Sequence, residues 1–305
     1  MRKVVVFLSL LASVSVAWAG TFTGVIVYGD SLSDNGNLFA AVGQPAAPYF
    51  NGRRSNGPVA VENMAAILGS PLYDFAWIGA TTGIGNYSDG GTPTTNGAFN
   101  LPGMAVQVAA TSGLVPTFAT NGLFVVWGGP NDFLSPSPLD SNDPFKVADR
   151  GVSDLLAIVT GLQAAGVEHI LVPGMPDLGL TPYYQSLGGG QAAGASFITD
   201  YFNSMLVAGL PGGVTYFDTA GLMRSIVANP AAFGFTDVTD PCFNGTIVCA
   251  NPDQYLFFDS FHPAAAAHGI LGQEFAQAAV PEPTTCILVF SGAIAVVRKR
   301  KLMKI

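Results

Sequence analysis

Short apolar segments alternate with helical stretches along most of this chain, and this alternation restricts its fold more than any other feature. Strands are expected at residues 24–28, 72–77, 123–127, 169–172 and 214–217. Helices are expected at residues 59–68, 104–110, 145–165, 192–206 and 263–278. Strand–helix repetition at these lengths implies βαβ crossovers, in which helices cover both faces of a parallel sheet. The pattern predicts an α/β fold with a mainly parallel five-stranded sheet in a single domain.

Three segments between these elements have no regular period and are rich in glycine or turn residues. They are residues 83–97, 188–194 and 229–256. Such segments run over the surface of a domain, and long ones often carry functional sites. We expect all three to be surface loops, and some of them to form the rim of a cleft.

The N-terminus has the three parts of a secretory signal peptide. Arg2 and Lys3 are basic, residues 4–17 are apolar, and Ala17-Trp18-Ala19 supplies the small residues of a cleavage site. This order predicts a signal peptide over residues 1–19 that is removed after Ala19. A membrane anchor is the alternative, but the apolar run is short and ends in small residues.

The C-terminus combines a Pro-Glu-Pro sequence, an apolar run and a basic end. Residues 280–284 read VPEPT, residues 284–297 are apolar, and residues 298–301 are all basic. The apolar run is shorter than the ~20 residues of an ordinary membrane span, but snorkelling basic side chains let a short span sit in a membrane. We therefore expect a short transmembrane segment here, and an ordinary C-terminal anchor is one interpretation of it.

The same residues closely resemble the PEP-CTERM sorting tail of bacteria. In that family, an exosortase-like membrane enzyme recognises the Pro-Glu-Pro sequence, removes the tail and releases the protein to the cell surface or matrix. The resemblance implies that residues 280–305 are a sorting tail, with an exosortase-like partner and transient anchorage in the inner membrane. It also implies that the body, at residues 20–279, lies outside the cytoplasm.

Charge distinguishes the body from the two ends. Residues 20–282 contain five basic side chains and all twenty acidic ones, which gives this stretch a net charge of −15. A body of this charge repels nucleic acid and anionic lipid headgroups, so neither is an expected partner.

Two of the three cysteines stand close together in the body. Cys242 and Cys249 are seven residues apart in a turn-rich stretch, whereas Cys286 lies in the tail. In an exported protein, such a pair is expected to form a disulfide that closes a small loop, and two reduced thiols are the alternative. No cluster of ligands surrounds any of the three histidines in the sequence, so no metal site is predicted.

Residues with possible catalytic roles follow the expected strands at the points where the strands end. Ser31 follows the first strand, Gly79 follows the second, and Asn131 follows the third. Asp259 and His262 stand just before the last expected helix. Ligands of open α/β sheets bind at the carboxyl ends of the strands, so the topology places all five residues at one edge.

These five residues fit nucleophilic catalysis. A serine hydroxyl needs an adjacent base, and the base needs an acid that orients it. Asp259 stands three residues before His262, so one turn of backbone brings its carboxylate to Nδ1 and leaves Nε2 for Ser31. Developing negative charge on a substrate needs donors, which the backbone N–H groups of Ser31 and Gly79 and the side-chain amide of Asn131 could supply.

Four segments in order along the chain resemble the GDSL, or SGNH, family of esterases and lipases. They are Gly29-Asp30-Ser31-Leu32, Gly79 in WIGATTG, Gly129-Pro-Asn131-Asp132, and Asp259-Ser-Phe-His262-Pro263. The resemblance implies a three-layer αβα sandwich of flavodoxin-like type that hydrolyses carboxylic esters without a metal or organic cofactor. It implies Ser31 as nucleophile, His262 as base, Asp259 as partner of the base, and Ser31, Gly79 and Asn131 as oxyanion donors.

The leading hypothesis is an exported serine ester hydrolase that forms an acyl-enzyme. The subgroup that this chain resembles contains secreted bacterial lipases, phospholipases and haemolysin-like acyl esterases, so a small acyl ester or lipid is the expected substrate. One alternative is an O-acetylesterase that acts on acetylated glycan of an exported polysaccharide. Another is a surface or matrix protein that binds glycan without turnover, because a fold alone does not establish catalysis.

Other polar residues near these motifs have structural interpretations. Asp34 is expected to fix the loop after Ser31, and Asp132 is expected to cap the turn that follows it. His268 is expected to have a core or surface role. Arg53 and Arg54 are candidates for contact with an acidic group of the substrate, with a solvated loop as the alternative.

Overall fold

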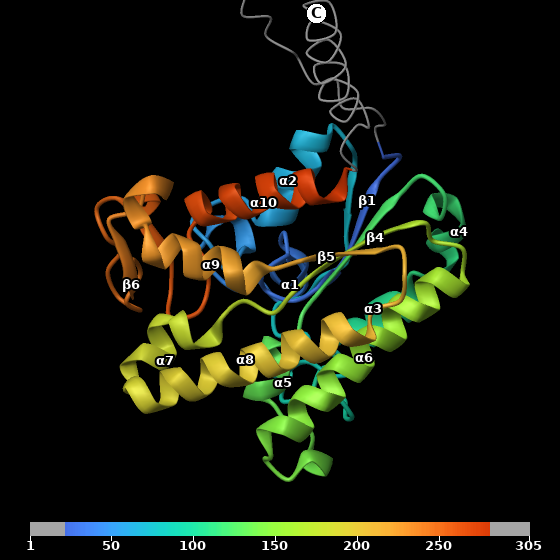
Figure 1. The fold of residues 1–305 in the computed structure, drawn as a ribbon, viewed down its shortest axis with the longest axis horizontal. Helices are drawn as coiled ribbons and strands as arrows, with labels where there is room; N and C mark the ends of the chain where they lie inside the picture. Colours follow the sequence, from blue (N-terminus) through green and yellow to red (C-terminus); the bar gives the residue numbers. More distant parts are fainter. Residues whose placement is uncertain (1–21, 281–305) are drawn as a thin grey trace, which may run out of the picture. The chain divides into compact units, whose positions relative to one another are not determined.

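A single parallel sheet forms the centre of the computed structural model, which describes residues 22–280 (Figure 1). The strands are β1 (Val25–Gly29), β2 (Leu72–Asp74), β3 (Leu123–Trp127), β4 (His169–Pro173) and β5 (Val214–Phe217). Their order in the sheet is β2-β1-β3-β4-β5, and every neighbouring pair is parallel. This is the strand order of flavodoxin-like folds, and the predicted fold class is confirmed.

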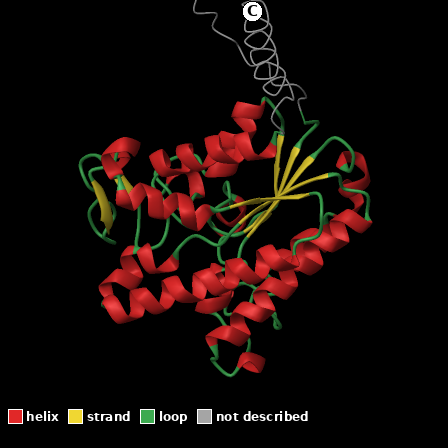
Figure 2. Ribbon diagram, viewed as in Figure 1, coloured by secondary structure: helices red, strands yellow, loops and turns green. Residues whose placement is uncertain are grey.

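Helices cover both faces of this sheet, so the fold has three layers (Figure 2). Successive side chains of a strand point to opposite faces, and in β1 Val25 and Val27 pack on one side while Ile26 and Tyr28 pack on the other. The first side is covered by α2 (Ala60–Leu68) and α10 (Ala265–Ala279), and the second by α3 (Met104–Ala110), α6 (Pro144–Ala164) and α8 (Gly189–Gly209). Burial on both faces explains why β1 and β3 are unbroken apolar runs.

The predicted strand at residues 72–77 is longer than the observed β2. Asp74 ends the strand because its side chain turns back, and Oδ1 accepts a hydrogen bond from the backbone N–H of Ala76 at 2.9 Å. The backbone N–H groups of Phe75 and Trp77 still donate to carbonyl groups of β1. The segment therefore stays attached to the sheet as it leads toward Gly79.

The predicted surface loop at residues 188–194 is wrong, because α8 already begins at Gly189. Glycine in a helix costs about 1 kcal/mol relative to alanine, which is why the sequence suggested a loop. The helix forms because Ala192 and Ala195 are buried, Ala195 within the same apolar core as α6. Tertiary packing here outweighs the low propensity of the glycines.

Several short elements of the described chain have no counterpart in the sequence prediction. The helices are α1 (Asn37–Val42), α4 (Val115–Phe118), α5 (Pro130–Leu134), α7 (Pro182–Ser186) and α9 (Thr219–Ala228), and the strands β6 (Asp237–Pro241) and β7 (Tyr255–Phe257) form a second, two-stranded sheet. Short 3₁₀ helices lie at Phe50–Gly52, Tyr87–Asp89, Ser112–Leu114, Pro138–Asp140, Leu178–Leu180, Pro230–Phe233 and Pro252–Gln254. Most of these elements are too short to show a helical period in the sequence.

The topology creates a crevice between two central strands. β1 and β3 are neighbours, but the chain passes from β1 to the edge strand β2 and from β3 toward β4 and β5. Ligands of such sheets bind outside the carboxyl ends of the strands at this switch point. Ser31 follows β1 and Asn131 follows β3, so both residues stand at the crevice.

The prediction of a transmembrane segment needs correction. Within residues 22–280, no helix is long and apolar enough to cross a membrane. The fourteen residues at 284–297 to which the segment was assigned fall short of the ~20 that a spanning helix needs, and they lie outside the described residues. The predicted signal peptide and all of the predicted sorting tail except Val280 lie outside the described residues too.

Candidate active site

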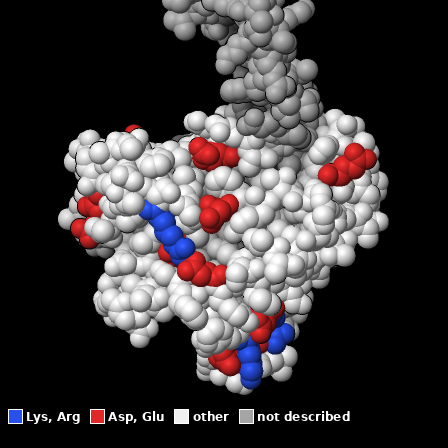
Figure 3. Space-filling model, viewed as in Figure 1, with Lys and Arg blue, Asp and Glu red and all other residues white. Residues whose placement is uncertain are grey.

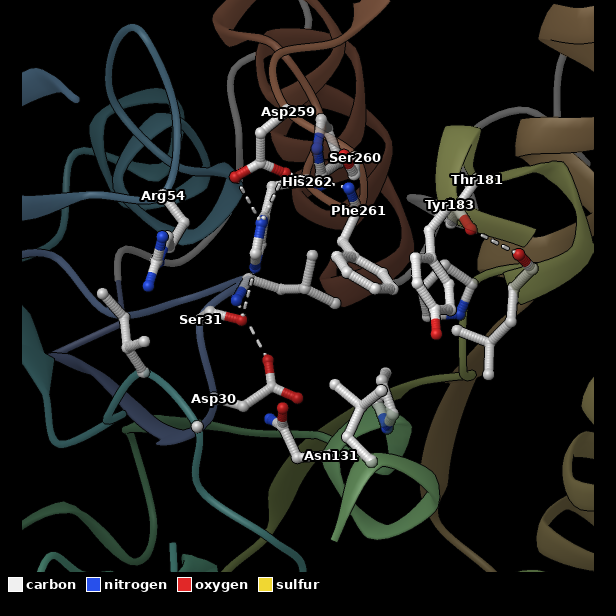
Figure 4. Close-up of a pocket in the computed structure, with 18 of the residues that line it drawn as sticks. Asp30, Ser31, Arg54, Asn131, Thr181, Tyr183, Asp259, Ser260, Phe261 and His262 are labelled. Atoms are coloured by element: carbon white, nitrogen blue, oxygen red, sulfur yellow. Dashed lines mark hydrogen bonds and ion pairs between the residues drawn. The ribbon is translucent and has the colours of Figure 1, made fainter. Parts of the chain in front are cut away.

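Ser31, His262 and Asp259 form a continuous chain of hydrogen bonds at the crevice (Figure 4). The Oγ of Ser31 lies 2.8 Å from Nε2 of His262. The Nδ1 of the same ring lies 2.8 and 2.9 Å from the two carboxylate oxygens of Asp259. Asp259 and His262 share one short turn, whereas Ser31 stands 228 positions before Asp259 in the sequence. The structure brings all three side chains together.

The loop that carries Asp259 holds its carboxylate in place. The Oδ1 atom accepts hydrogen bonds from the backbone N–H groups of Phe261 at 2.9 Å and His262 at 2.8 Å. Burial alone would raise the pKa of Asp259, but the charge and hydrogen bond of His262, together with these N–H groups, hold that pKa well below its usual range. An ionised Asp259 favours the proton on Nδ1 and leaves Nε2 free to accept the proton of Ser31.

Ser31 lies in a tight turn directly after β1. The backbone N–H groups of Ser33 and Asp34 both donate to the carbonyl of Asp30, at 3.1 and 2.9 Å. The carboxylate of Asp34 then accepts from the N–H of Gly36 at 2.7 Å and, in the segment after β2, from the N–H of Ile78 at 2.8 Å. Asp34 therefore fixes the loop after Ser31, as expected, and also joins it to the segment that contains Gly79.

Three candidate hydrogen-bond donors belong to residues that line the cavity beside Ser31. Ser31, Gly79 and Asn131 all line this cavity. Among the described residues, no carbonyl or side chain accepts from the backbone N–H of Ser31 or of Gly79. One N–H of the Asn131 amide donates to the carbonyl of Ala80 at 3.0 Å, which orients the amide and leaves its second N–H available.

Glycine is required at position 79 for two reasons. Its φ of +81° lies in the left-handed region, which residues with a Cβ atom rarely adopt. A Cβ atom built there would collide with the side chains of Ser88 and Asn86. The loop after β2 can therefore approach the crevice with its backbone, as a donor to an oxyanion must.

Asp132 does not cap its own turn, contrary to the prediction. Its carboxylate is fully buried and accepts from the backbone N–H of Thr82 at 3.0 Å and from the hydroxyl of Thr82 at 2.7 Å. Burial raises the pKa of Asp132 to about 7. The contact ties the Asn131 turn to the Gly79 loop, so two candidate oxyanion donors are held in register.

Asp30 supplies a second buried carboxyl group at the cavity. Its Oδ1 accepts from the backbone N–H of Leu32 at 2.9 Å, and its Oδ2 has no partner among the described residues. Figure 4 shows the Asp30 carboxyl facing the amide of Asn131. Burial raises the pKa of Asp30 to about 6, so below that pH the crevice carries less negative charge.

Tyr49 makes a contact with Asp259 that the sequence does not predict. Its hydroxyl donates to Oδ2 of Asp259 at 2.8 Å, from a position 210 residues away in the chain. The Tyr49 ring packs edge-on against the rings of Phe258 and Phe243. Burial and the nearby Asp259 charge raise the pKa of Tyr49 to about 12, so it remains a donor at neutral pH.

The cavity has a volume of about 470 Å³, within the range of small-molecule sites. Its wall is mainly apolar and is supplied by several loops, including Leu32, Ile78, Leu134, Leu178, Met223, Phe243 and Phe261. The segments at 83–97 and 229–256 contribute to it through Tyr87 and Phe243, so both reach the rim of the site. A disulfide joins Cys242 to Cys249 and closes the small loop that contains Phe243.

The other two histidines lie away from the cavity. His268 is buried in α10, where Nδ1 accepts from the backbone N–H of Ala60 at 3.1 Å. Burial, with a smaller contribution from the charge of His262, lowers the pKa of His268 to about 3, so this ring is neutral. His169 begins β4 and packs edge-on against the ring of Phe22.

Comparison with known proteins assigns the chain to a family. Residues 25–275 match the family model of GDSL-like lipases and acylhydrolases. The chain belongs to the GDSL lipase/acylhydrolase family. The match includes every residue of the cavity described above, from Ser31 to His262. Membership in this family makes the chain a hydrolase of ester bonds and disfavours the alternative of a protein without turnover.

Two relatives illustrate this similarity. The chain is 26% identical over 299 residues to a phosphatidylcholine-sterol acyltransferase of Aeromonas hydrophila, with 91% of this chain and 86% of that one covered. It is 30% identical over 316 residues to a GDSL esterase/lipase of Arabidopsis thaliana, with 84% and 82% covered. Among solved structures, an acetylxylan esterase from Geobacillus stearothermophilus is 15% identical with a TM-score of 0.47, and 87% and 97% of the two chains are covered.

Proposed function

We propose that this chain is an exported serine esterase that hydrolyses acyl esters through an acyl-enzyme. The observation that supports the proposal is the distance of 2.8 Å between Ser31 Oγ and His262 Nε2, in a cavity that three residues with candidate oxyanion donors also line. A nucleophile, a base within hydrogen-bond reach and a group that orients the base are what this reaction needs.

The first half of the reaction transfers the acyl group to the enzyme. Ser31 Oγ attacks the carbonyl carbon of the ester as its proton passes to Nε2 of His262. The carbonyl oxygen becomes an oxyanion that accepts from the N–H groups of Ser31, Gly79 and Asn131. The intermediate then collapses, the bond to the alcohol oxygen breaks, and His262 returns the proton to that oxygen as the alcohol leaves.

The second half releases the acid. A water molecule gives a proton to His262 Nε2 and attacks the acyl carbon, so a second oxyanion forms on the same three donors. Its collapse breaks the bond to Ser31 Oγ, which regains the proton from His262. Through both halves Asp259 stays ionised, and its negative charge stabilises the imidazolium whenever His262 holds the extra proton.

The apolar wall of the cavity supports an acyl chain longer than acetyl as part of the substrate. Leucine, isoleucine, methionine and phenylalanine side chains gain about 25 cal/mol for each Å² of apolar surface that they bury, and an acetyl group offers little such surface. A lipid-like ester therefore fits the cavity better than acetylated glycan does. The named activity of the Aeromonas relative, a phosphatidylcholine-sterol acyltransferase, is in keeping with a lipid substrate.

The ends of the chain support the proposal of export. Residues 1–19 have the order of a signal peptide, and residues 280–305 resemble a tail that an exosortase-like enzyme would process. The disulfide between Cys242 and Cys249 suits an oxidising compartment outside the cytoplasm. We therefore propose the cell surface or the extracellular matrix as the site of action.

The proposal is tested with purified residues 20–282 and p-nitrophenyl esters from acetyl to palmitoyl. We expect turnover in the wild type with the highest kcat/KM at a medium or long chain. Ser31→Ala should lose at least about a thousandfold in kcat, because the members of a triad act as a unit. A folded wild type that hydrolyses none of the esters, or a Ser31→Ala variant that keeps most of its rate, would contradict the mechanism.

A further inference from the structure

The cavity contains one basic side chain whose role the reaction above does not explain. Arg54 lines the cavity together with Ser31 and His262. Arginine keeps its charge at every pH of interest, so this guanidinium places a permanent positive charge beside the reacting groups. The surrounding body has a strong net negative charge, which makes a cation in the substrate site unusual for this molecule.

The other arginines of the described chain have acidic partners. Arg53 pairs with Glu62, Arg150 pairs with Asp140, and Arg224 pairs with Asp177. On the face shown in Figure 3, the basic side chains lie directly beside acidic ones. Within residues 22–280, by contrast, no ion pair joins Arg54 to a carboxylate. The Arg54 charge acts on the Tyr49 side chain and is not neutralised by a paired carboxylate, so the guanidinium is available to an anionic ligand.

Arg54 is held in place and does not lie in a solvated loop. Its guanidinium lies over the ring of Tyr49, with Cζ 5.1 Å from the ring centroid. The next two residues anchor the backbone: Ser55 Oγ donates to the carbonyl of Pro263 at 3.1 Å, and Asn56 Oδ1 accepts from the N–H of Ala265 at 2.8 Å. These bonds attach the loop to the segment that carries His262, so Arg54 keeps a fixed relation to the site.

The two sides of the nucleophile differ in chemistry. Figure 4 shows Arg54 on one side of the Ser31–His262 pair and the aromatic rings of Phe261 and Tyr183 on the other. These two rings pack together with centroids 4.6 Å apart and line the same cavity. An ester bound with its carbonyl carbon at Ser31 therefore meets the Phe261 and Tyr183 rings on one side, and on the other the Arg54 guanidinium, which lies over the Tyr49 ring.

We propose that Arg54 binds one anionic group, a phosphate or a carboxylate, on the alcohol part of the substrate. The inference rests on the proposed ester hydrolysis and adds the chemistry of the leaving group to it. The acyl chain takes the apolar side, so the group that reaches Arg54 belongs to the alcohol. Arginine matches both anions through paired N–H donors, and a partly desolvated pair of this kind is stronger than a neutral hydrogen bond. A polyanion remains excluded, because a single cation in a body of charge −15 offsets only one such group.

The test compares esters that share an octanoyl group and differ in the charge of the alcohol. One pair is monooctanoylglycerol and monooctanoylglycerol phosphate, and the other is O-octanoyl lactamide and O-octanoyl lactate. The quantity measured is the ratio of kcat/KM for the anionic ester to kcat/KM for its neutral partner. The pair that shows the larger effect of Arg54 identifies phosphate or carboxylate as the better ligand.

Arg54→Gln should lower this ratio at least about tenfold, which corresponds to about 1.4 kcal/mol of transition-state binding. Arg54→Lys should lower it less, because the charge remains while the paired donors are lost. Arg53→Gln is the matched control: it removes the same charge from the neighbouring residue, which pairs with Glu62 instead of lining the cavity. In that variant the ratio should stay within about twofold of the wild type, since only a general effect of charge remains.

A ratio that Arg54→Gln leaves unchanged would overturn the inference, even if both rates fall together, because equal losses indicate a positioning role. A wild type that hydrolyses the neutral esters and not the anionic ones would overturn it as well. Both results leave the ester hydrolase intact. A folded wild type that hydrolyses none of the four esters would contradict the proposed function itself and the inference with it.

Discussion

The hydroxyl of Tyr49 adds a fourth group to the hydrogen-bonded chain of Ser31, His262 and Asp259. It donates to Oδ2 of Asp259, the carboxylate oxygen that the backbone N–H groups of Phe261 and His262 leave unused. A hydrogen bond to an ionised carboxylate fixes its orientation and spreads its charge. Tyr49 is therefore a positioning residue that acts on His262 through Asp259.

Tyr49→Phe should lower kcat several-fold and change KM less, because the lost hydroxyl donates to Asp259 and so acts on the base of the reaction. The acidic limb of the kcat/KM profile should move to higher pH, since Asp259 without this donor attracts the imidazolium proton more strongly. The measurement is the pH profile of hydrolysis of a neutral ester. Tyr87→Phe is the control, because Tyr87 lines the cavity without a hydrogen bond to the triad. Equal profiles for the two variants would show that Tyr49 only fills space.

Among individual residues, the sequence predicted those site residues that stand at the end of a strand or on one short turn. Ser31, Gly79 and Asn131 follow strands of the central sheet, so topology places these three at one edge, and Asp259 and His262 share one turn before the last helix. Tyr49 and Arg54 could not be placed in this way. They come from an irregular loop whose path depends on bonds such as that from Ser55 to Pro263, 208 residues apart.

The contact between α2 and α10 contains a titratable group that is buried without charge. His268 on α10 accepts from the first N–H of α2, at Ala60, and its pKa falls from 6.5 to about 3. The folded state therefore binds fewer protons than the unfolded state between these two values. Stability from this residue is complete above pH 6.5 and is lost as the pH falls through this window.

His268→Gln should flatten this dependence, because glutamine can accept the same hydrogen bond without titrating. Between pH 6.5 and about pH 4.5, the wild type should lose up to about 2–3 kcal/mol more unfolding free energy than the variant does. Urea midpoints at several pH values give the difference directly. The buried Asp30 and Asp132 act in the opposite sense over part of this range, but they are present in both proteins and cancel. Parallel curves for the two proteins would contradict the assignment to His268.

Helices and strands were predictable from the sequence where their burial produces a long pattern of apolar residues. The strands β1 and β3 are fully buried and apolar throughout, and α6 repeats its apolar residues over 21 positions. By contrast, α5 spans only five residues and owes its start to Gly129 and Pro130, which read as a turn. The error at α8 arose from glycines that packing overrides, and β6 and β7 pair only through the folded course of a long loop.

The net charge of the whole molecule affects how strongly it binds to a lipid bilayer. The stretch 20–282 has a net charge of −15, and uncharged surface covers most of the face in Figure 3. A body of this kind should stay away from anionic bilayers even though the substrate proposed for it is a lipid-like ester. Its substrate is then expected as dispersed molecules or in a neutral surface.

We expect residues 20–282 to bind neutral phosphatidylcholine vesicles at least as well as vesicles that contain phosphatidylglycerol. Co-sedimentation at low ionic strength measures this, and the Ser31→Ala variant prevents hydrolysis during the assay. Added salt should reduce the difference, because it screens the repulsion over about 10 Å at 0.1 M. Stronger binding to the anionic vesicles would show that a local basic surface dominates over the net charge.

The overall architecture followed from the alternation of strands and helices, and the family from four short motifs in order. The shape of the cavity did not follow, because its wall is built from irregular segments such as the disulfide-closed loop around Phe243. The functions predicted for the two chain ends depend on residues outside 22–280 and stay predictions.

The position of the triad along the chain has a consequence for its biosynthesis. Ser31 directly follows the first strand, whereas Asp259 and His262 precede the last helix by only a few residues. A ribosome therefore makes the proposed nucleophile early and the proposed base almost last. A nascent chain carries a serine without a base until nearly all of the domain has been translated, so it cannot hydrolyse esters before synthesis is complete.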